Sequence, residues 1–227
     1  MKKLIYTLYL TLLVTGLTYS QREYKTLDPE RAGKIFRNPV YKKGNPQGSP
    51  YLQKMFMSAI VEGLNLKAYM RYNVYDDEFE FITPKNDTLI LDKIEDFNTI
   101  IFTGLNKKYT LTKYTDSSNK LEYGYLIAVY KKGNYELLKK ENIAFTEEKK
   151  AKTTLERDMP AKYLKLDDTY FLGNNDSGIS EFPNGKKALV KLFPNHKQVI
   201  EAFIKDNKIS FGEESDLRKI IDFLSTL

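Results

Sequence analysis

Hydrophobic and polar residues alternate with a period of two through most of residues 57–182, and this pattern predicts a β-rich region. Ala68, Met70 and Tyr72, for example, fall on one face of a strand whose other face carries charged residues and a tyrosine. Such alternation is typical of a half-buried strand. The segments predicted as strands are residues 58–62, 66–73, 79–81, 88–91, 99–103, 109–114, 123–130, 135–139, 163–166, 169–172 and 179–182.

Residues 123–130 form the most apolar of these segments, so we expect them to be a central strand. Polar, turn-forming sequences separate the strands, among them the pair at 167–168 and the run at 174–178. The apolar pattern fades between residues 146 and 160, which predicts a mobile exposed loop.

Beyond residue 182 the hydrophobic period changes to about 3.6, which predicts a helical end. We expect helices at 186–193, 195–206 and 213–227. The second has an apolar stripe of Val199, Ile200, Phe203 and Ile204, and the third has one of Leu217, Ile220, Ile221 and Leu224. The predicted fold is therefore mainly β, of the α+β class: a curved antiparallel sheet or open barrel, followed by a C-terminal helical region.

The N-terminus has the layout of a secretory signal peptide. Lys2 and Lys3 precede an apolar run at 4–17, and small residues lead to a polar Gln21, which suits cleavage after Ser20. The alternative is an uncleaved single-span anchor. Glycines and prolines then break up residues 21–56, where we expect a short helix at 28–36. The predicted organisation is a signal peptide at 1–20, an extended lead-in at 21–56, an antiparallel β domain at 57–182 and helices packed on it at 183–227.

Composition excludes several classes of chemistry. The chain has no cysteine, which rules out disulfides, thiolate zinc sites, thiol catalysis and a lipid on an N-terminal cysteine. Its net charge is +6, and its lysine pairs are scattered among acidic residues, whereas a nucleic-acid interface needs a concentrated basic face. We therefore expect no nucleic-acid partner. The 17 tyrosines and 13 phenylalanines provide the bulk for an aromatic core.

Candidate catalytic and metal-binding residues are few. The single histidine, His196, has no nucleophile or orienting partner near it in the sequence. The run of carboxylates at 76–78 and Glu80, which alternates with Phe79 and Phe81, could serve hydrolysis or bind a hard cation. The same residues suit a turn entering a strand, where neighbouring carboxylates diverge. Residues 174–178 carry oxygen ligands without the distal glutamate of a calcium loop. We predict no catalytic residue, metal or cofactor.

Residues 107–114 interleave aromatic and basic residues, among them Tyr109, Lys113 and Tyr114. This composition is used to bind acidic glycans or single-stranded nucleic acid. Given the predicted export, a glycan or an anionic lipid is the ligand expected here. We therefore take these three residues as the candidate ligand-binding residues of the chain. The alternative is an ordinary exposed strand face, which has the same composition.

Three segments carry a resemblance to a known group of proteins. They are GSPYL at 48–52, RYNVYDDEFEF at 71–81 and LFPN at 192–195. Together they resemble a recurrent group of uncharacterised exported proteins of Bacteroidota. The resemblance would cover most of the chain after the signal peptide. It implies a cell-envelope setting in such a bacterium and assigns no site residues.

These observations predict an exported, non-catalytic protein of the periplasm or the extracellular space. We expect it to bind an envelope component, which could be a glycan, a lipid or a protein, through a sheet face or edge. After signal cleavage it would have no stable transmembrane span. One alternative is a carboxylate-dependent hydrolase centred on Asp76, Asp77 and Glu78. Another is an assembly component that uses a strand edge or its terminal helix.

Overall fold

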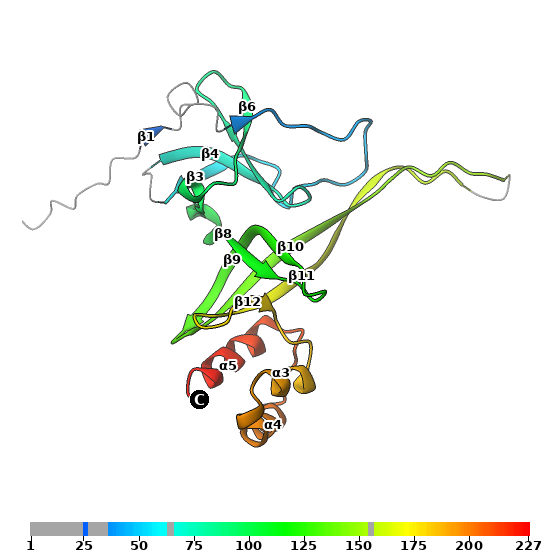
Figure 1. Ribbon diagram of the computed structural model, residues 1–227. Helices are drawn as coiled ribbons and strands as arrows, with labels where there is room; N and C mark the ends of the chain where they lie inside the picture. Colours follow the sequence, from blue (N-terminus) through cyan, green and yellow to red (C-terminus); the bar gives the residue numbers. More distant parts are fainter. Residues whose placement is uncertain (1–24, 27–35, 63–65, 154–156) are drawn as a thin grey trace, which may run out of the picture.

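The computed structural model describes residues 25–26, 36–62, 66–153 and 157–227 (Figure 1). It confirms the mainly β architecture with α-helices near the C-terminus. The strands are β1 (Lys25–Thr26), β2 (Phe36–Arg37), β3 (Met57–Val61), β4 (Leu66–Asn73), β5 (Glu78–Ile82), β6 (Thr88–Leu91), β7 (Thr99–Phe102), β8 (Lys107–Thr115), β9 (Leu121–Lys132), β10 (Tyr135–Thr146), β11 (Lys162–Asn174) and β12 (Gly178–Glu181).

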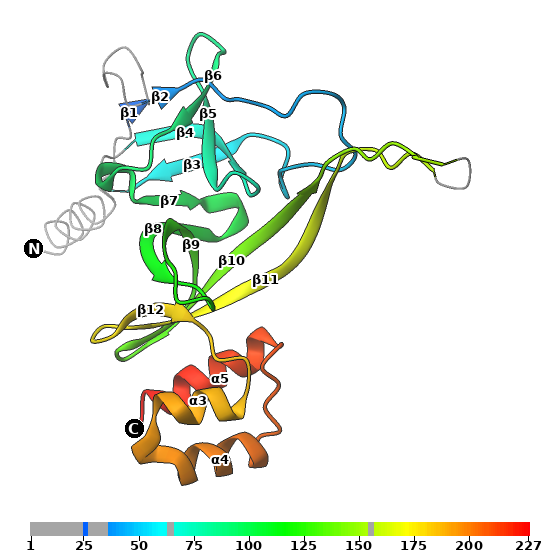
Figure 2. The same cartoon turned by 45° about the vertical axis from the view of Figure 1, so that its right-hand side comes forward.

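All twelve strands belong to one curved sheet. Its order is β12-β11-β10-β9-β8-β7-β3-β4-β5-β6-β2, and β1 pairs in parallel with β4. Neighbours along the main path are antiparallel, as predicted. β12 also bridges β8 at Ser180 and Thr115, so β8–β12 close into a small ring (Figure 2). The strand predicted to be central is β9, which is an interior strand of this path between β8 and β10.

The upper part of the sheet encloses an aromatic core. Phe79 and Phe81 are fully buried there, and Tyr72 and Tyr109 pack with their ring centroids 4.8 Å apart. Ala68, Met70 and Tyr72 all point into this core, as their alternation predicts. Short 3₁₀ turns, η1 (Glu95–Phe97) and η2 (Thr103–Leu105), connect its strands.

Two further cores lie below it. A small one, made of Tyr114, Leu126, Leu138 and Phe171, fills the ring of β8–β12. The other holds the helices against the sheet through Leu137 and other buried residues. Figures 1 and 2 show the helices α3 (Lys186–Leu192), α4 (Lys197–Asp206) and α5 (Glu214–Leu224) on this lower side.

The apolar stripe of α5 is confirmed, because Leu217, Ile220, Ile221 and Leu224 are all buried. The stripe predicted for α4 is partly wrong, since Val199 is 49% exposed. Consecutive helix residues are about 100° apart, and only the Ile200 side of α4 faces the core. A 3₁₀ turn, η3 (Pro194–His196), precedes α4.

Among the described residues, no helix has the length and apolar character needed to span a membrane. The helix predicted at 28–36 lies outside the described residues except for Phe36, which is in β2.

β10 and β11 form a hairpin much longer than predicted. The prediction of two strands joined by a turn at 167–168 is wrong, because β11 is continuous through both residues. Lys140 pairs with Thr169 and Asn142 with Leu166, so one extra residue bulges out of β11 at Asp167 and Asp168. A turn and a bulge use the same short polar residues, and pairing with β10 along its length selects the bulge.

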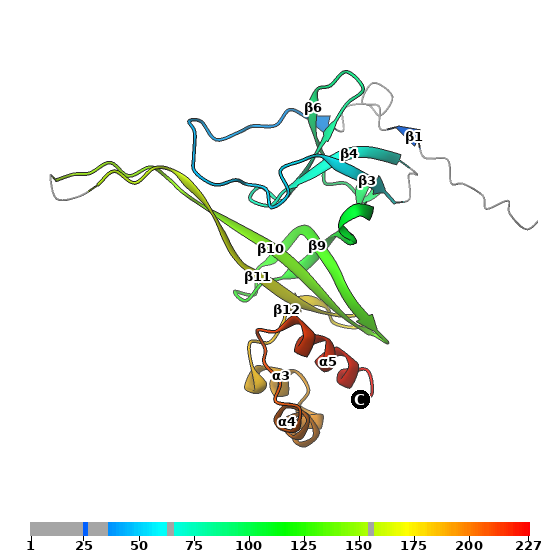
Figure 3. The same ribbon diagram turned by 180° about the vertical axis from the view of Figure 1, so that it is seen from behind.

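The end of this hairpin projects from the body as an arm, which Figure 3 shows from behind. It contains most of the loop predicted at 146–160. Lys149 and Met159 exchange backbone hydrogen bonds of 2.8 and 2.7 Å, so strand-like pairing resumes beyond the end of β10. At the base of the arm, Phe145 and Tyr163 pack together and against Tyr75.

Candidate functional site

The carboxylates at 76–78 do not converge. Asp77 points inward, where its carboxylate accepts hydrogen bonds from the Tyr72 hydroxyl, from Lys93 Nζ at 2.6 Å and from the Tyr125 backbone N–H at 3.2 Å. Asp76 instead accepts from Asn73 Nδ2 at 2.8 Å. Each therefore supports the turn from β4 to β5, in which Asp77 has a left-handed φ of 57°.

The neighbouring glutamates also have separate partners. Glu78 pairs with Arg37, while Glu80 is 1% exposed and accepts from Arg71 Nη2 at 2.7 Å and the Tyr51 hydroxyl at 2.7 Å. Burial and the adjacent Glu80 carboxylate raise the pKa of the Tyr51 hydroxyl well above its ordinary value. These contacts attach the lead-in to β4 and β5.

The remaining metal-binding and catalytic candidates also lie apart from one another. Among the described residues, no group of three or more histidine, cysteine, aspartate or glutamate side chains could hold a metal ion. Residues 174–178 form the turn between β11 and β12, where Asn174 Oδ1 accepts from the Asp176 backbone N–H at 2.9 Å. His196 is half-buried in the turn before α4.

The three candidate ligand-binding residues do not share an exposed face. Tyr109 and Tyr114 are 3% and 4% exposed and belong to different cores. Tyr109 donates to Glu141 Oε2 at 3.1 Å, and Tyr114 packs against Phe171 with its hydroxyl accepting from Lys140. Lys113 alone is exposed, and it lies opposite Tyr123 on β9.

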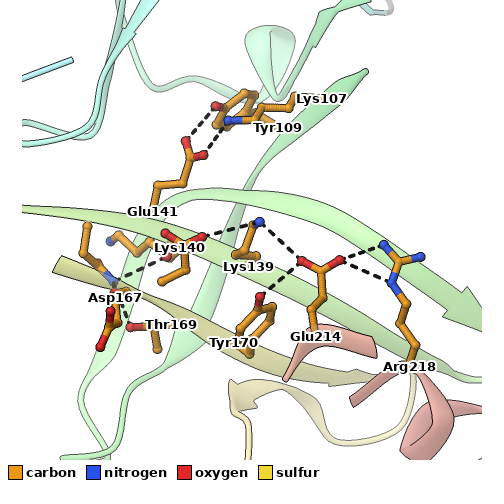
Figure 4. Close-up of polar contacts among 12 residues, drawn as sticks. Lys107, Tyr109, Lys139, Lys140, Glu141, Asp167, Thr169, Tyr170, Glu214 and Arg218 are labelled. Carbon is orange, nitrogen blue, oxygen red and sulfur yellow. Dashed lines mark hydrogen bonds and ion pairs between the residues drawn. The ribbon is translucent and has the colours of Figure 1, made fainter. Parts of the chain in front are cut away.

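A buried carboxylate lies opposite the bulge of β11. Glu141, on β10, is 6% exposed and receives hydrogen bonds from Lys107 and Tyr109 (Figure 4). Burial and the charge of Glu141 raise the pKa of Tyr109 far above its ordinary value. The next residue, Asn142, donates to the Asp167 carbonyl and to Thr169 Oγ1, both at 2.9 Å, and so holds the bulge in place.

A second cluster, here called the polar junction, consists of Lys139, Asp168, Tyr170, Glu214 and Arg218. Figure 4 labels Lys139, Tyr170, Glu214 and Arg218. Lys139 Nζ lies 3.4 Å from both Asp168 Oδ2 and Glu214 Oε2. Tyr170 donates to Glu214 Oε2 at 3.2 Å, and Arg218 Nη2 lies 2.9 Å from Oε1. Burial and the Glu214 charge raise the pKa of Tyr170 to about 12. The polar junction therefore holds α5 against β10 and β11.

Beside the polar junction, the outer edge of β11 lies open. At one end, the Tyr163 backbone N–H donates to the Gln47 carbonyl at 2.8 Å, so Tyr163 directs its backbone groups outward. Lys165, two residues on, must direct its N–H and C=O the same way. At the other end, the Phe182 N–H donates to the Tyr170 carbonyl at 2.8 Å. No described segment pairs with the outer edge between these two points.

The pairing with β11 ends at Phe182, and Pro183 follows it directly. Beyond this point the chain leaves the line of β12, which ends at Glu181. The space beyond it is a groove of about 600 Å³, here called the edge groove. It is lined by residues 165–170 of β11, by residues 181–184 and by Phe211, Gly212 and Leu217 beside α5. Asp168 contributes to this lining, and its Oδ1 is buried without a hydrogen-bond partner among the described residues.

A second groove, of about 750 Å³, lies on the other side of the polar junction. Lys107, Lys108, Lys139 and Arg218 line it, which gives it a basic character. Each of these four cations already forms an ion pair, with Glu141, Glu62, Asp168 and Glu214 respectively. An incoming anion would have to compete with those carboxylates, so this groove is the weaker candidate.

Sequence reasoning did not locate the edge groove. Its signals are present but weak: a proline directly after a strand, and two adjacent aspartates that bulge. Comparison with protein-family models, with curated proteins and with solved structures found no match.

Proposed function

We propose that this chain is an exported, non-catalytic protein of the cell envelope that binds an envelope component along the open edge of β11. The observation that carries the binding role is the open stretch of the β11 edge between the Gln47 and Phe182 hydrogen bonds, where Lys165 directs its N–H and C=O outward. Unpaired edges promote association, and proteins commonly shield them. Here the edge instead opens onto a groove with apolar and acidic walls.

Export is supported by the basic start and the apolar run before Gln21. The resemblance to exported proteins of Bacteroidota agrees with it. N-terminal sequencing of the protein recovered from its source tests this part of the proposal. We expect the mature chain to begin at Gln21, and an intact Met1 would contradict cleavage.

The alternatives receive less support. A carboxylate hydrolase needs convergent acids, whereas Asp76, Asp77 and Glu78 each have their own structural partners. An assembly role through the last helix needs an exposed apolar face, whereas the apolar face of α5 is buried. Association through the strand edge remains, and it coincides with the proposal.

The binding role can be tested by immobilising the mature chain and passing envelope extract of its source over it. Lys165→Pro removes the outward N–H of β11, and Lys165→Ala is the matched control that retains it. We expect one lipid, glycan or protein to be retained saturably by the wild type and by Lys165→Ala, and lost from Lys165→Pro. Retention of nothing, or equal retention by the proline variant, would contradict a binding role at this edge.

A further inference from the structure

We propose that the edge groove takes an extended, cationic segment of another polypeptide, which adds to β11 as a strand beyond the end of β12. This inference rests on the proposed function and names the class of partner. Its basis is the spacing and direction of the backbone groups, together with the charge of the groove.

The backbone groups of β11 favour a polypeptide. Lys165 presents one donor and one acceptor on the outer edge, between the Gln47 and Phe182 hydrogen bonds. A residue of an added strand matches this donor and acceptor, because its own N–H and C=O point to the same side of the strand. A glycan or lipid headgroup has no comparable repeat.

The length of the opening fixes the length of the segment. The edge is unpaired over residues 164–169, and strand residues rise about 3.3 Å each, which gives an opening of roughly 20 Å. A segment of about four to six residues fits between the two existing hydrogen bonds. It would continue the line along which β12 already pairs with β11.

The lining of the edge groove selects the side chains. Its charged residues are Asp167, Asp168 and Glu181 against Lys165, so carboxylates predominate. Asp168 Oδ2 is paired with Lys139 and Glu181 Oε2 accepts from the Ser117 N–H, whereas Asp168 Oδ1 has no hydrogen-bond partner among the described residues. Beside them, the partly exposed Phe211 provides apolar wall above the buried Phe182 and Leu217. A segment that alternates aliphatic and basic residues would bury one face on this wall and place ammonium groups near the carboxylates.

Three synthetic peptides of about eight residues test the proposal by fluorescence anisotropy. One alternates valine and lysine, the second is the same peptide with alternate backbone amides N-methylated, and the third alternates valine and glutamate. We expect the mature wild-type chain to bind the first saturably and the other two at least about tenfold more weakly. Equal binding of the N-methylated peptide would overturn strand addition, and equal binding of the glutamate peptide would overturn the charge preference.

The protein variants provide the complementary test. Lys165→Pro should weaken binding of the valine–lysine peptide at least about tenfold, while Lys165→Ala should leave it within about twofold. Circular dichroism checks that the proline variant is folded. If it is not, the N-methylated peptide still decides the question on the unchanged protein.

Two further outcomes separate this inference from the proposed function. If no peptide binds, yet envelope extract yields a non-protein component that Lys165→Pro loses, the polypeptide inference fails and the proposed function stands. If neither binds, both fail. Sedimentation of the mature chain identifies a third occupant: a dimer that Lys165→Pro dissociates would assign the edge to a second copy of this chain and overturn the inference.

Discussion

Glu80 is a carboxylate whose position in the alternating pattern predicts exposure, yet it is buried. It lies directly across from Arg71 on the outer face of β4 and β5, and the lead-in covers both through Tyr51. The Arg71 guanidinium stacks between the rings of Tyr51 and Phe56, 4.0 and 4.4 Å from their centroids. Period-two patterning reports which face a residue is on, and it cannot report what later covers that face.

Arg71→Met should therefore be strongly destabilising, because it leaves the Glu80 carboxylate buried without its cation. We expect the free energy of unfolding to fall by about 3–5 kcal/mol, measured by urea denaturation. The double variant Arg71→Met/Glu80→Gln should recover part of that loss. The single variant Glu80→Gln completes the comparison. A loss in the double variant equal to the sum of the two single-variant losses would show that the two side chains do not interact.

Arg37→Met is the matched control for Arg71→Met. Arg37 also pairs with a glutamate of β5, Glu78, but its side chain is 49% exposed. An exposed ion pair contributes about 0–1 kcal/mol, so this variant should unfold close to the wild type. A loss as large as that of Arg71→Met would mean that burial of Glu80 is not the cause.

Glu214 makes the polar junction sensitive to acid. Burial opposes its ionisation, but hydrogen bonds from Arg218 and the charge of Lys139 outweigh burial and lower its pKa below the ordinary value of 4.5. A carboxylate with a lowered pKa stabilises the folded state above its unfolded pKa, and that contribution is lost as the pH falls through the folded pKa. The attachment of α5 should therefore weaken in acid.

Glu214→Gln tests this dependence. At pH 7 we expect it to lower the free energy of unfolding by about 1–2 kcal/mol, and the gap to the wild type should narrow towards about pH 3. Urea denaturation at both pH values measures the gap. Glu201→Gln, on α4, is the control, since no ion pair of Glu201 is found in the described part of the chain. A gap that does not change with pH would contradict the role of the Glu214 charge.

The strands and helices were largely predictable because their signal is local. Alternation marks Ala68, Met70 and Tyr72 as inward, and the stripe of α5 marks its buried face. The candidate site was not predictable, because it depends on pairing between distant segments. Lys139 and Glu214 are 75 residues apart, and the choice between a turn and a bulge at 167–168 is made by the partner strand.

The lead-in pairs with β11 at one end of the open edge, through a close approach at Gly48. A Cβ at Gly48 would lie 2.5 Å from the Tyr163 carbonyl oxygen, and the φ of +80° disfavours other residues. Gly44 has a similar φ of +86° with nothing within 4 Å of such a Cβ. Gly44→Ala should cost about 1 kcal/mol from its backbone alone.

Gly48→Ala should cost clearly more than Gly44→Ala, because it also pushes Gln47 away from β11. Thermal unfolding compares the two variants. Hydrogen exchange should show faster exchange of the Tyr163 amide in Gly48→Ala alone, since that amide donates to Gln47. Equal behaviour of the two variants would mean that the close approach does not hold the lead-in.

The β10–β11 hairpin connects all three cores of the molecule. Leu137 and Leu172 pack with the helices, and Leu138 and Phe171 fill the ring of β8–β12. Farther along β10, Ile143 packs against the upper aromatic core. Since one pair of strands contributes to every core, loss of any one core should disturb the others.

We therefore expect a single cooperative unfolding transition for the whole described structure. The chain contains no tryptophan, so single tryptophans can report on its two ends. Phe56→Trp would report on the upper part of the sheet, beside Arg71. Phe203→Trp would report on the helices, where the rings of Phe203 and Phe223 stack with their centroids 4.2 Å apart. Urea midpoints from the two fluorophores should coincide with each other and with circular dichroism. A lower midpoint for Phe203→Trp fluorescence than for Phe56→Trp, with two steps in the circular dichroism, would instead mean that the helices detach before the sheet unfolds.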